Sequence, residues 1–109
     1  MTLRKDAWGY LIIWEYRVGG GMESRFEQIY GSDGDWAQFF RRDPAYLGTE
    51  LIRDAKADRS YVTLDLWASH AAYEEFRQRH GAEYEAIDQK CGEMTEQERE
   101  VGRFVRVEG

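Results

Sequence analysis

The residues of this chain best suited to chemistry gather in one segment, residues 61–76, which reads YVTLDLWASHAAYEEF. Its first half alternates apolar and other residues up to Trp67, and this period of two predicts a strand. Ser69 is a favourable helix N-cap, and Tyr73 and Phe76 begin an apolar stripe at helical spacing. The strand and helix bring an indole N–H and a phenol together, where both can orient a carbonyl or phenolate oxygen. The same two rings can instead fill the seam between sheet and helix.

Acid–base chemistry near neutral pH has few candidates here. His80 lies on the apolar stripe of the following helix and is the better placed of the chain's two histidines. It can act as a base, or it can be a hydrogen-bonded core residue. Asp65 and Glu15 lie within predicted strands on faces that should be covered, where a carboxylate needs a partner or a raised pKa. We expect each to pair with an arginine such as Arg17 or Arg53, in preference to a role as base.

Composition limits the classes of function. The 109 residues predict a single domain, 1–109, and acidic residues outnumber basic ones by 21 to 15. No basic cluster is present, which argues against nucleic-acid binding, and no apolar run approaches the ~20 residues of a membrane span. One cysteine, Cys91, allows no internal disulfide, and the N-terminus lacks the pattern of a signal peptide. These features predict a cytoplasmic protein.

Periodicity places the segment within a regular order of elements. The predicted elements are a strand at 8–18, a helix at 22–30, a short helix capped by Asp35 and ending before Pro44, strands at 46–55 and 60–68, a helix at 70–94 interrupted at Gly81, a helical turn begun by the Thr95–Glu98 capping box, and a strand at 101–107. This βαββαβ order predicts an α+β, ferredoxin-like fold, with helices on one face of a four-stranded antiparallel sheet. Strand 8–18 is apolar on both faces, so we expect a second copy to cover the other face in a homodimer.

The chain resembles the antibiotic biosynthesis monooxygenase family. The resemblance rests on the order of elements and on two short sequences, Trp-Ala-Ser ending at Ser69 and Ala-Tyr-x-x-Phe ending at Phe76. Members of that family are dimeric α+β barrels, and the resemblance covers roughly residues 8–107. It implies a monooxygenase that needs no metal or flavin cofactor. It also implies dioxygen as co-substrate and an aromatic small molecule, of the anthrone or quinol kind, as substrate.

The anthrone oxygenases of the actinorhodin type supply the closest comparison of residues. Trp67 and Tyr73 match their pocket Trp and Tyr, whereas Thr63 stands in place of an Asn and Ile87 in place of an Arg. The expected catalytic residues are Trp67, Tyr73 and His80, and the expected substrate-binding residues are Thr63, Phe76, Trp36 and Phe40.

Two alternatives remain open. The haem-degrading branch of the family fits less well, because Ala86 stands where its iron-binding His is found. A non-catalytic ligand-binding or dimer-forming module on the same fold is the other alternative. In that module the rings of Trp36, Phe39 and Phe40 fill the pocket.

Overall fold

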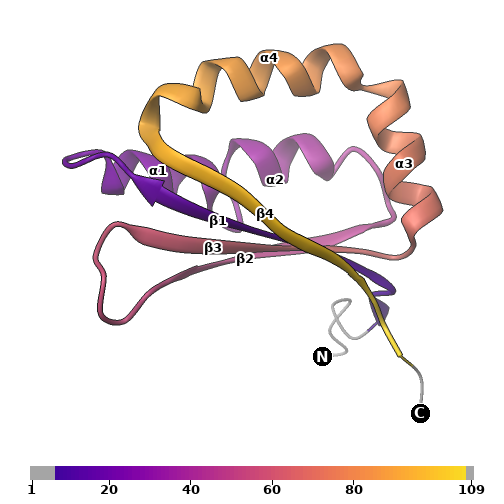
Figure 1. Ribbon diagram of the computed structural model, residues 1–109. Helices are drawn as coiled ribbons and strands as arrows, with labels where there is room; N and C mark the ends of the chain where they lie inside the picture. The colour runs from indigo at the N-terminus through magenta and orange to yellow at the C-terminus, as the bar shows by residue number, and fades with distance from the viewer. Residues whose placement is uncertain (1–6, 108–109) are drawn as a thin grey trace.

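The computed structural model describes residues 7–107, in which all helices lie on one side of a single sheet (Figure 1). The strands are β1 (Tyr10–Val18), β2 (Tyr46–Arg53), β3 (Ser60–Trp67) and β4 (Thr95–Val105). The helices are α1 (Glu23–Tyr30), α2 (Asp35–Phe40), α3 (His70–Arg79) and α4 (Gly81–Cys91), and a 3-10 turn, η2, follows at Gly92–Met94. The strand order is β2-β3-β1-β4, and every neighbouring pair is antiparallel. The predicted α+β, ferredoxin-like fold is therefore confirmed.

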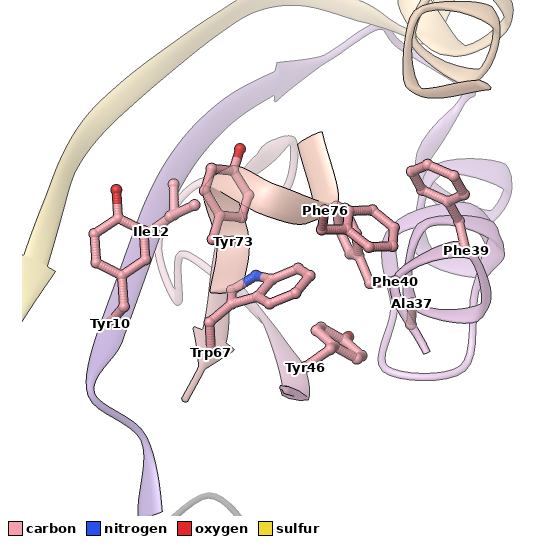
Figure 2. Close-up of a cluster of buried hydrophobic side chains, with 9 residues drawn as sticks. All are labelled: Tyr10, Ile12, Ala37, Phe39, Phe40, Tyr46, Trp67, Tyr73 and Phe76. Carbon is pink, nitrogen blue, oxygen red and sulfur yellow. The ribbon is translucent and has the colours of Figure 1, made fainter. Parts of the chain in front are cut away.

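Side chains of β1 alternate between the two faces of the sheet. Those on the helix side are Tyr10, Ile12, Trp14, Tyr16 and Val18. On β3, Trp67 lies opposite Tyr10, so the odd-numbered residues of β3 share this inner face. Two clusters of buried side chains fill the space beneath the helices, and Trp36 packs against both. Figure 2 shows the cluster around Trp67, which we call the Trp67 cluster.

A glycine lies where the start of α2 packs closely against the backbone of α1. Gly34 is the N-cap of α2, and a Cβ atom there would lie 2.3 Å from the carbonyl oxygen of Ile29. Only a residue without a side chain fits this approach. The sequence predicted Asp35 as the cap; that prediction was wrong by one residue, because Asp35 is already inside the helix.

The predicted long helix is divided in two. His80 ends α3 with non-helical backbone angles and α4 begins at Gly81, so the interruption predicted there is confirmed. The helical turn predicted at Thr95 is wrong, because β4 already begins at that residue. The N–H of Gly19 donates to the carbonyl of Met94 at 2.9 Å, and Thr95 then pairs with β1. Strand pairing thus overrides the local capping signal.

The outer face of the sheet carries no helix (Figure 1). Ile52 of β2 is 50% exposed and Phe104 of β4 is 44% exposed. Within the described part of the chain, no helix is both long and apolar enough to cross a membrane. The expectation that the N-terminus carries no signal peptide rests partly on residues 1–6, which lie outside the described residues.

Candidate functional site

A cavity lies between the inner face of the sheet and the helices α2 and α4. Its walls are formed by Trp14, Tyr16, Tyr30, Trp36, Phe40, Thr49, Thr63, Asp65, Tyr84, Asp88 and Glu98. Some of these residues, such as Phe40, are buried, whereas Asp88 and Glu98 are exposed, so the cavity runs from the core towards the surface. The volume within which the centre of a water molecule can move is about 40 Å³. One water needs roughly 10–15 Å³ on this measure, so the cavity has room for roughly three.

Aromatic rings from the helices form the wall opposite the sheet. Trp36 and Phe40 of α2 stack with their ring centroids 5.8 Å apart. Tyr84 of α4 lies 5.0 Å from the Trp36 ring and closes the space between the two helices. From the sheet, Trp14 and Tyr16 of β1 stack at 6.4 Å. A flat apolar ligand would find aromatic faces on both sides of such a site.

The carboxyl group of Asp65 lies in the interior of the cavity. Asp65 is partly buried and accepts a hydrogen bond at 2.7 Å from the hydroxyl of Thr49. Burial raises the pKa of Asp65 from 3.8 to about 6, although the hydrogen bond from Thr49 opposes that shift. The hydroxyl of Thr63 also lies here and donates to Tyr16 at 3.4 Å. Burial raises the pKa of Tyr16 well above its usual value, so this phenol stays protonated.

Of the two strand carboxylates, Glu15 pairs with an arginine as expected, although with neither of the two named, whereas Asp65 meets no arginine and accepts from Thr49. Arg17 pairs with Glu96 at 3.2 Å, and Arg53 lies 3.9 Å from Glu27. Glu15 pairs with Arg99, at 2.7 Å, on the outer face. The reason is the register of the sheet: Arg99 of β4 lies directly opposite Glu15 of β1, and Thr49 of β2 lies directly opposite Asp65 of β3.

Three of the sequence-predicted site residues lie in the cavity wall. They are Thr63 on β3 and Trp36 and Phe40 on α2. Trp67, Tyr73 and Phe76 lie instead in the Trp67 cluster, where Figure 2 shows their rings packed together. Trp67 is fully buried, and its ring centroid is 5.5 Å from that of Phe40. It therefore supports the cavity from behind Phe40, and its catalytic role stays a prediction.

The indole N–H of Trp67 has an unusual environment. Its ring contacts those of Tyr46, Tyr73 and Phe76 at 5.3–5.4 Å, in addition to Phe40. Among residues 7–107, no hydrogen-bond partner reaches its Nε1 atom. A buried donor without a partner costs free energy, so this N–H lowers the stability of the fold.

Tyr73 is linked to the cavity wall through an arginine. Arg77 donates from Nη1 to the Tyr73 hydroxyl at 3.1 Å, and its guanidinium carbon lies 3.6 Å from the centre of the Tyr84 ring. A cation on the face of a ring is attracted by the ring's quadrupole. Arg77 thus holds Tyr84 in the cavity wall and Tyr73 behind it.

His80 lies at the junction of α3 and α4, outside the cavity wall. Its Nδ1 atom is 3.2 Å from Glu83, and its ring packs on Phe76 at 4.6 Å. Its role as a base stays a prediction. The sequence favoured His80 over Asp65 as a base, but Asp65 lines the cavity and His80 does not. The sequence contained a signal for this. Asp65 is two residues from Thr63 in the same strand, so both side chains lie on one face.

Three carboxyl groups give the cavity a negative electrostatic character. Asp65 lies inside, and Asp88 of α4 and Glu98 of β4 line its exposed part. Anionic ligands are therefore disfavoured relative to neutral ones. In the described residues, no group of three or more His, Cys, Asp or Glu side chains is arranged to hold a metal ion.

Comparison with known proteins finds solved structures of the same fold. No family model matches the chain. A curated relative, the deoxynogalonate monooxygenase of Streptomyces nogalater, is 33% identical over 58 residues, and the match spans 53% of this chain but only 46% of that protein. SnoaB, a cofactor-independent oxygenase from Streptomyces nogalater, is 22% identical with a TM-score of 0.70, over 94% of this chain and 96% of that chain.

A second solved structure gives the same result. A Bordetella bronchiseptica protein assigned to the antibiotic biosynthesis monooxygenases is 22% identical with a TM-score of 0.68, over 92% of this chain and 98% of that chain. At such low identity, the likeness is one of fold. The resemblance predicted from the sequence is confirmed at that level: this chain has the fold of the antibiotic biosynthesis monooxygenases.

Proposed function

We propose that this protein is a cofactor-independent monooxygenase that oxidises a neutral aromatic molecule, of the anthrone or quinol kind, with dioxygen. The observation that supports it most is the ring-lined cavity with the titratable carboxyl group of Asp65 in its interior. Substrates of this kind become strong reductants once they lose a proton. The protein then has three tasks: to bind the rings, to keep water away and to take the proton.

The shape of the cavity restricts the substrate. Its present volume suits a single ring better than three fused rings, because it has room for roughly three waters. A three-ring substrate requires Trp36 or Tyr84 to rotate away from the other. The carboxylates of Asp88 and Glu98 at the exposed part disfavour substrates that arrive as anions.

The small volume also favours a second candidate function. Trp36 and Phe40 occupy much of the space between α2 and the sheet, as expected for a pocket filled by the chain's own rings. A non-catalytic binding module would bind a small aromatic ligand and consume no oxygen. The two candidates therefore differ in a single measurable quantity, the rate of oxygen uptake with ligand bound.

We also propose a homodimer formed through the outer face of the sheet. Ile52 and Phe104 lie on that face and are about half exposed. Apolar side chains gathered on an uncovered sheet face are typical of an interface, and a copy of the same sheet about a two-fold axis matches them.

Oxygen uptake in a Clark-type electrode tests the proposed activity. Dithranol, a three-ring anthrone, and methylhydroquinone, a one-ring quinol, are the two substrates, and buffer and heat-denatured protein give the background rates. We expect uptake above background with at least one of them. Quenching of tryptophan fluorescence without oxygen uptake supports the binding module, and neither quenching nor uptake with both compounds counts against the monooxygenase.

Variants of two tryptophans sharpen the test. Trp36→Phe enlarges the cavity, and we expect it to lower KM for dithranol more than for methylhydroquinone. Trp8→Phe is the matched control, because Trp8 is absent from the cavity wall and lies beside Arg106. If Trp36→Phe and Trp8→Phe changed the two KM values equally, the cavity would not select the substrate.

A further inference from the structure

We propose that Asp65 removes the proton from the substrate, and that Thr49 and Tyr46 hold its carboxyl group in position through a chain of two hydrogen bonds. This inference rests on the proposed function and goes beyond it by assigning the base. Thr49 and Tyr46 are positioning residues in this scheme, because they act through Asp65.

An irregularity of β2 brings the three side chains together. Residues an odd number apart in a regular strand point to opposite faces, so Tyr46 and Thr49 should diverge. The pairing register shifts between Tyr46 and Gly48, and Gly48 has a φ of 136°. This bulge inserts one residue, and both side chains then point to the inner face. Thr49 lies directly opposite Asp65 on β3.

The direction of each hydrogen bond follows from the inventory of protons. Thr49 has one hydroxyl proton and donates it to Oδ1 of Asp65 at 2.7 Å. The Tyr46 hydroxyl, 2.5 Å from the same Thr49 oxygen, must therefore be the donor in that contact. Both bonds favour the charged carboxylate, which accepts from one side only. Among the described residues, no hydrogen bond is recorded to Oδ2, which is left to meet a ligand.

The surroundings keep this base usable near neutral pH. Burial raises the pKa of Asp65 to about 6, which suits proton transfer better than the usual value of an aspartate. The titratable groups that share the cavity with it are Tyr16 on β1, Tyr30 on α1, Tyr84 and Asp88 on α4, and Glu98 on β4, and Tyr46 and Tyr73 lie nearby. Burial raises the pKa of Tyr46 to about 12, so it remains a donor.

The proton and electron balance is complete with dioxygen as the only co-reactant. The carboxylate of Asp65 takes one proton from an activated CH₂ group, and the C–H electron pair stays on the ring system as a delocalised anion. The anion passes one electron to dioxygen, and the two radicals combine into a carbon–oxygen bond, giving a peroxide anion. Asp65 returns its proton to the outer peroxide oxygen. It then takes the second C–H proton as the O–O bond breaks, and the hydroxide released accepts that proton as water.

An exchange experiment isolates the proton-transfer step from the oxygen chemistry. Dithranol is incubated with the protein under argon in deuterated buffer, and loss of its CH₂ signal is followed by NMR. We expect the wild type to accelerate exchange above buffer, and Asp65→Asn to slow it by roughly 10²–10⁴-fold, the usual contribution of a general base. Asp58→Asn, the same substitution at an exposed position in the β2–β3 turn, should leave the rate unchanged.

Two further variants test the positioning residues. Thr49→Val removes the donor but keeps the shape, and Tyr46→Phe removes only the outer hydroxyl. Thr49→Val should shift the pH midpoint of exchange upward, because the carboxylate loses the hydrogen bond that favours its charged form. A purely structural role for Thr49 would lower the rate equally at every pH. Fluorescence quenching by dithranol shows in each case that the ligand still binds.

The outcomes separate the two proposals. Exchange that depends on Asp65 without oxygen uptake supports the base and overturns the monooxygenase. Oxygen uptake with equal exchange rates in the wild type and Asp65→Asn supports the monooxygenase and overturns the base. Wild-type exchange no faster than buffer, with the ligand bound, also overturns the base.

Discussion

Truncation of Trp67 provides the sharpest test of how the fold supports the site. The side chain is fully buried, and its ring makes edge or tilted contacts with four other rings at 5.3–5.5 Å. Trp67→Ala should cost about 3–5 kcal/mol of unfolding free energy, the usual range for an aromatic-to-alanine change in a core. Trp67→Phe keeps most ring contacts. It leaves empty only the volume by which an indole exceeds a phenyl ring, which costs about 2 kcal/mol.

The unpartnered indole N–H reduces the cost of the phenylalanine variant. Removing a buried donor that makes no hydrogen bond returns about 1 kcal/mol. The net cost of Trp67→Phe is then about 1 kcal/mol, or a fall in Tm of about 4–8 °C for a domain of this size. Urea unfolding followed by circular dichroism gives both free energies, and oxygen uptake with dithranol gives the activity.

We expect Trp67→Phe to lower the Tm clearly, while the rate of oxygen uptake by the folded protein changes little. Trp36→Phe, in the cavity wall, should instead change KM for dithranol while its Tm changes less than that of Trp67→Phe. The reasoning is refuted if Trp67→Phe keeps its Tm within about 1 °C while kcat falls ten-fold or more. That result would mean that the indole N–H acts on the substrate, as the sequence predicted, and that the ring lies nearer to the ligand than this packing allows.

Three further predictions follow from single residues. Between pH 4 and pH 7, the unfolding free energy of the wild type should fall relative to Asp65→Asn by up to about 3 kcal/mol. The sign follows from a folded-state pKa of about 6 against the ordinary 3.8: the protonated form favours folding, and that contribution is complete below pH 4 and lost as pH rises through 6. Parallel pH profiles from urea titrations would contradict it. Gly48→Ala should cost about 1–3 kcal/mol, because its φ of 136° strains any other residue, and it should also weaken the Thr49–Asp65 bond. An unchanged Tm would contradict this. Phe104→Glu places a charge on the outer sheet face and should convert a dimer into a monomer in light scattering; a monomeric wild type would remove the basis of the homodimer.

Several features of the fold could be predicted because their causes are local. The alternation in β3 and the apolar stripe of α3 are periodicities within one segment. Ser69 caps α3 as expected, and its Oγ accepts the N–H of Ala72 at 3.1 Å. The interruption at Gly81 was also visible from the chain. The order of these elements was enough to indicate the fold, and through it the resemblance to oxygenases.

Errors arose where a partner distant in sequence decides the local structure. Thr95 and Glu98 have the spacing of a helix cap, but β1 recruits this segment into the sheet. Asp65 was expected to meet an arginine, yet Thr49, which lies opposite it through the register of β2, is its partner. Nothing in the sequence around Asp65 gives that register, because it depends on a bulge near Gly48.

Within the regular parts of the strands and helices, the sequence by itself determined which side chains share a face, since strand and helix periods are properties of neighbouring residues. Only the tertiary structure decided where the empty space lies. A void exists where side chains from several elements fail to meet, and its position depends on all of them at once. Trp67 and Thr63 stand on the same face of one strand, yet packing encloses the first ring completely and leaves the second residue in the wall of the cavity.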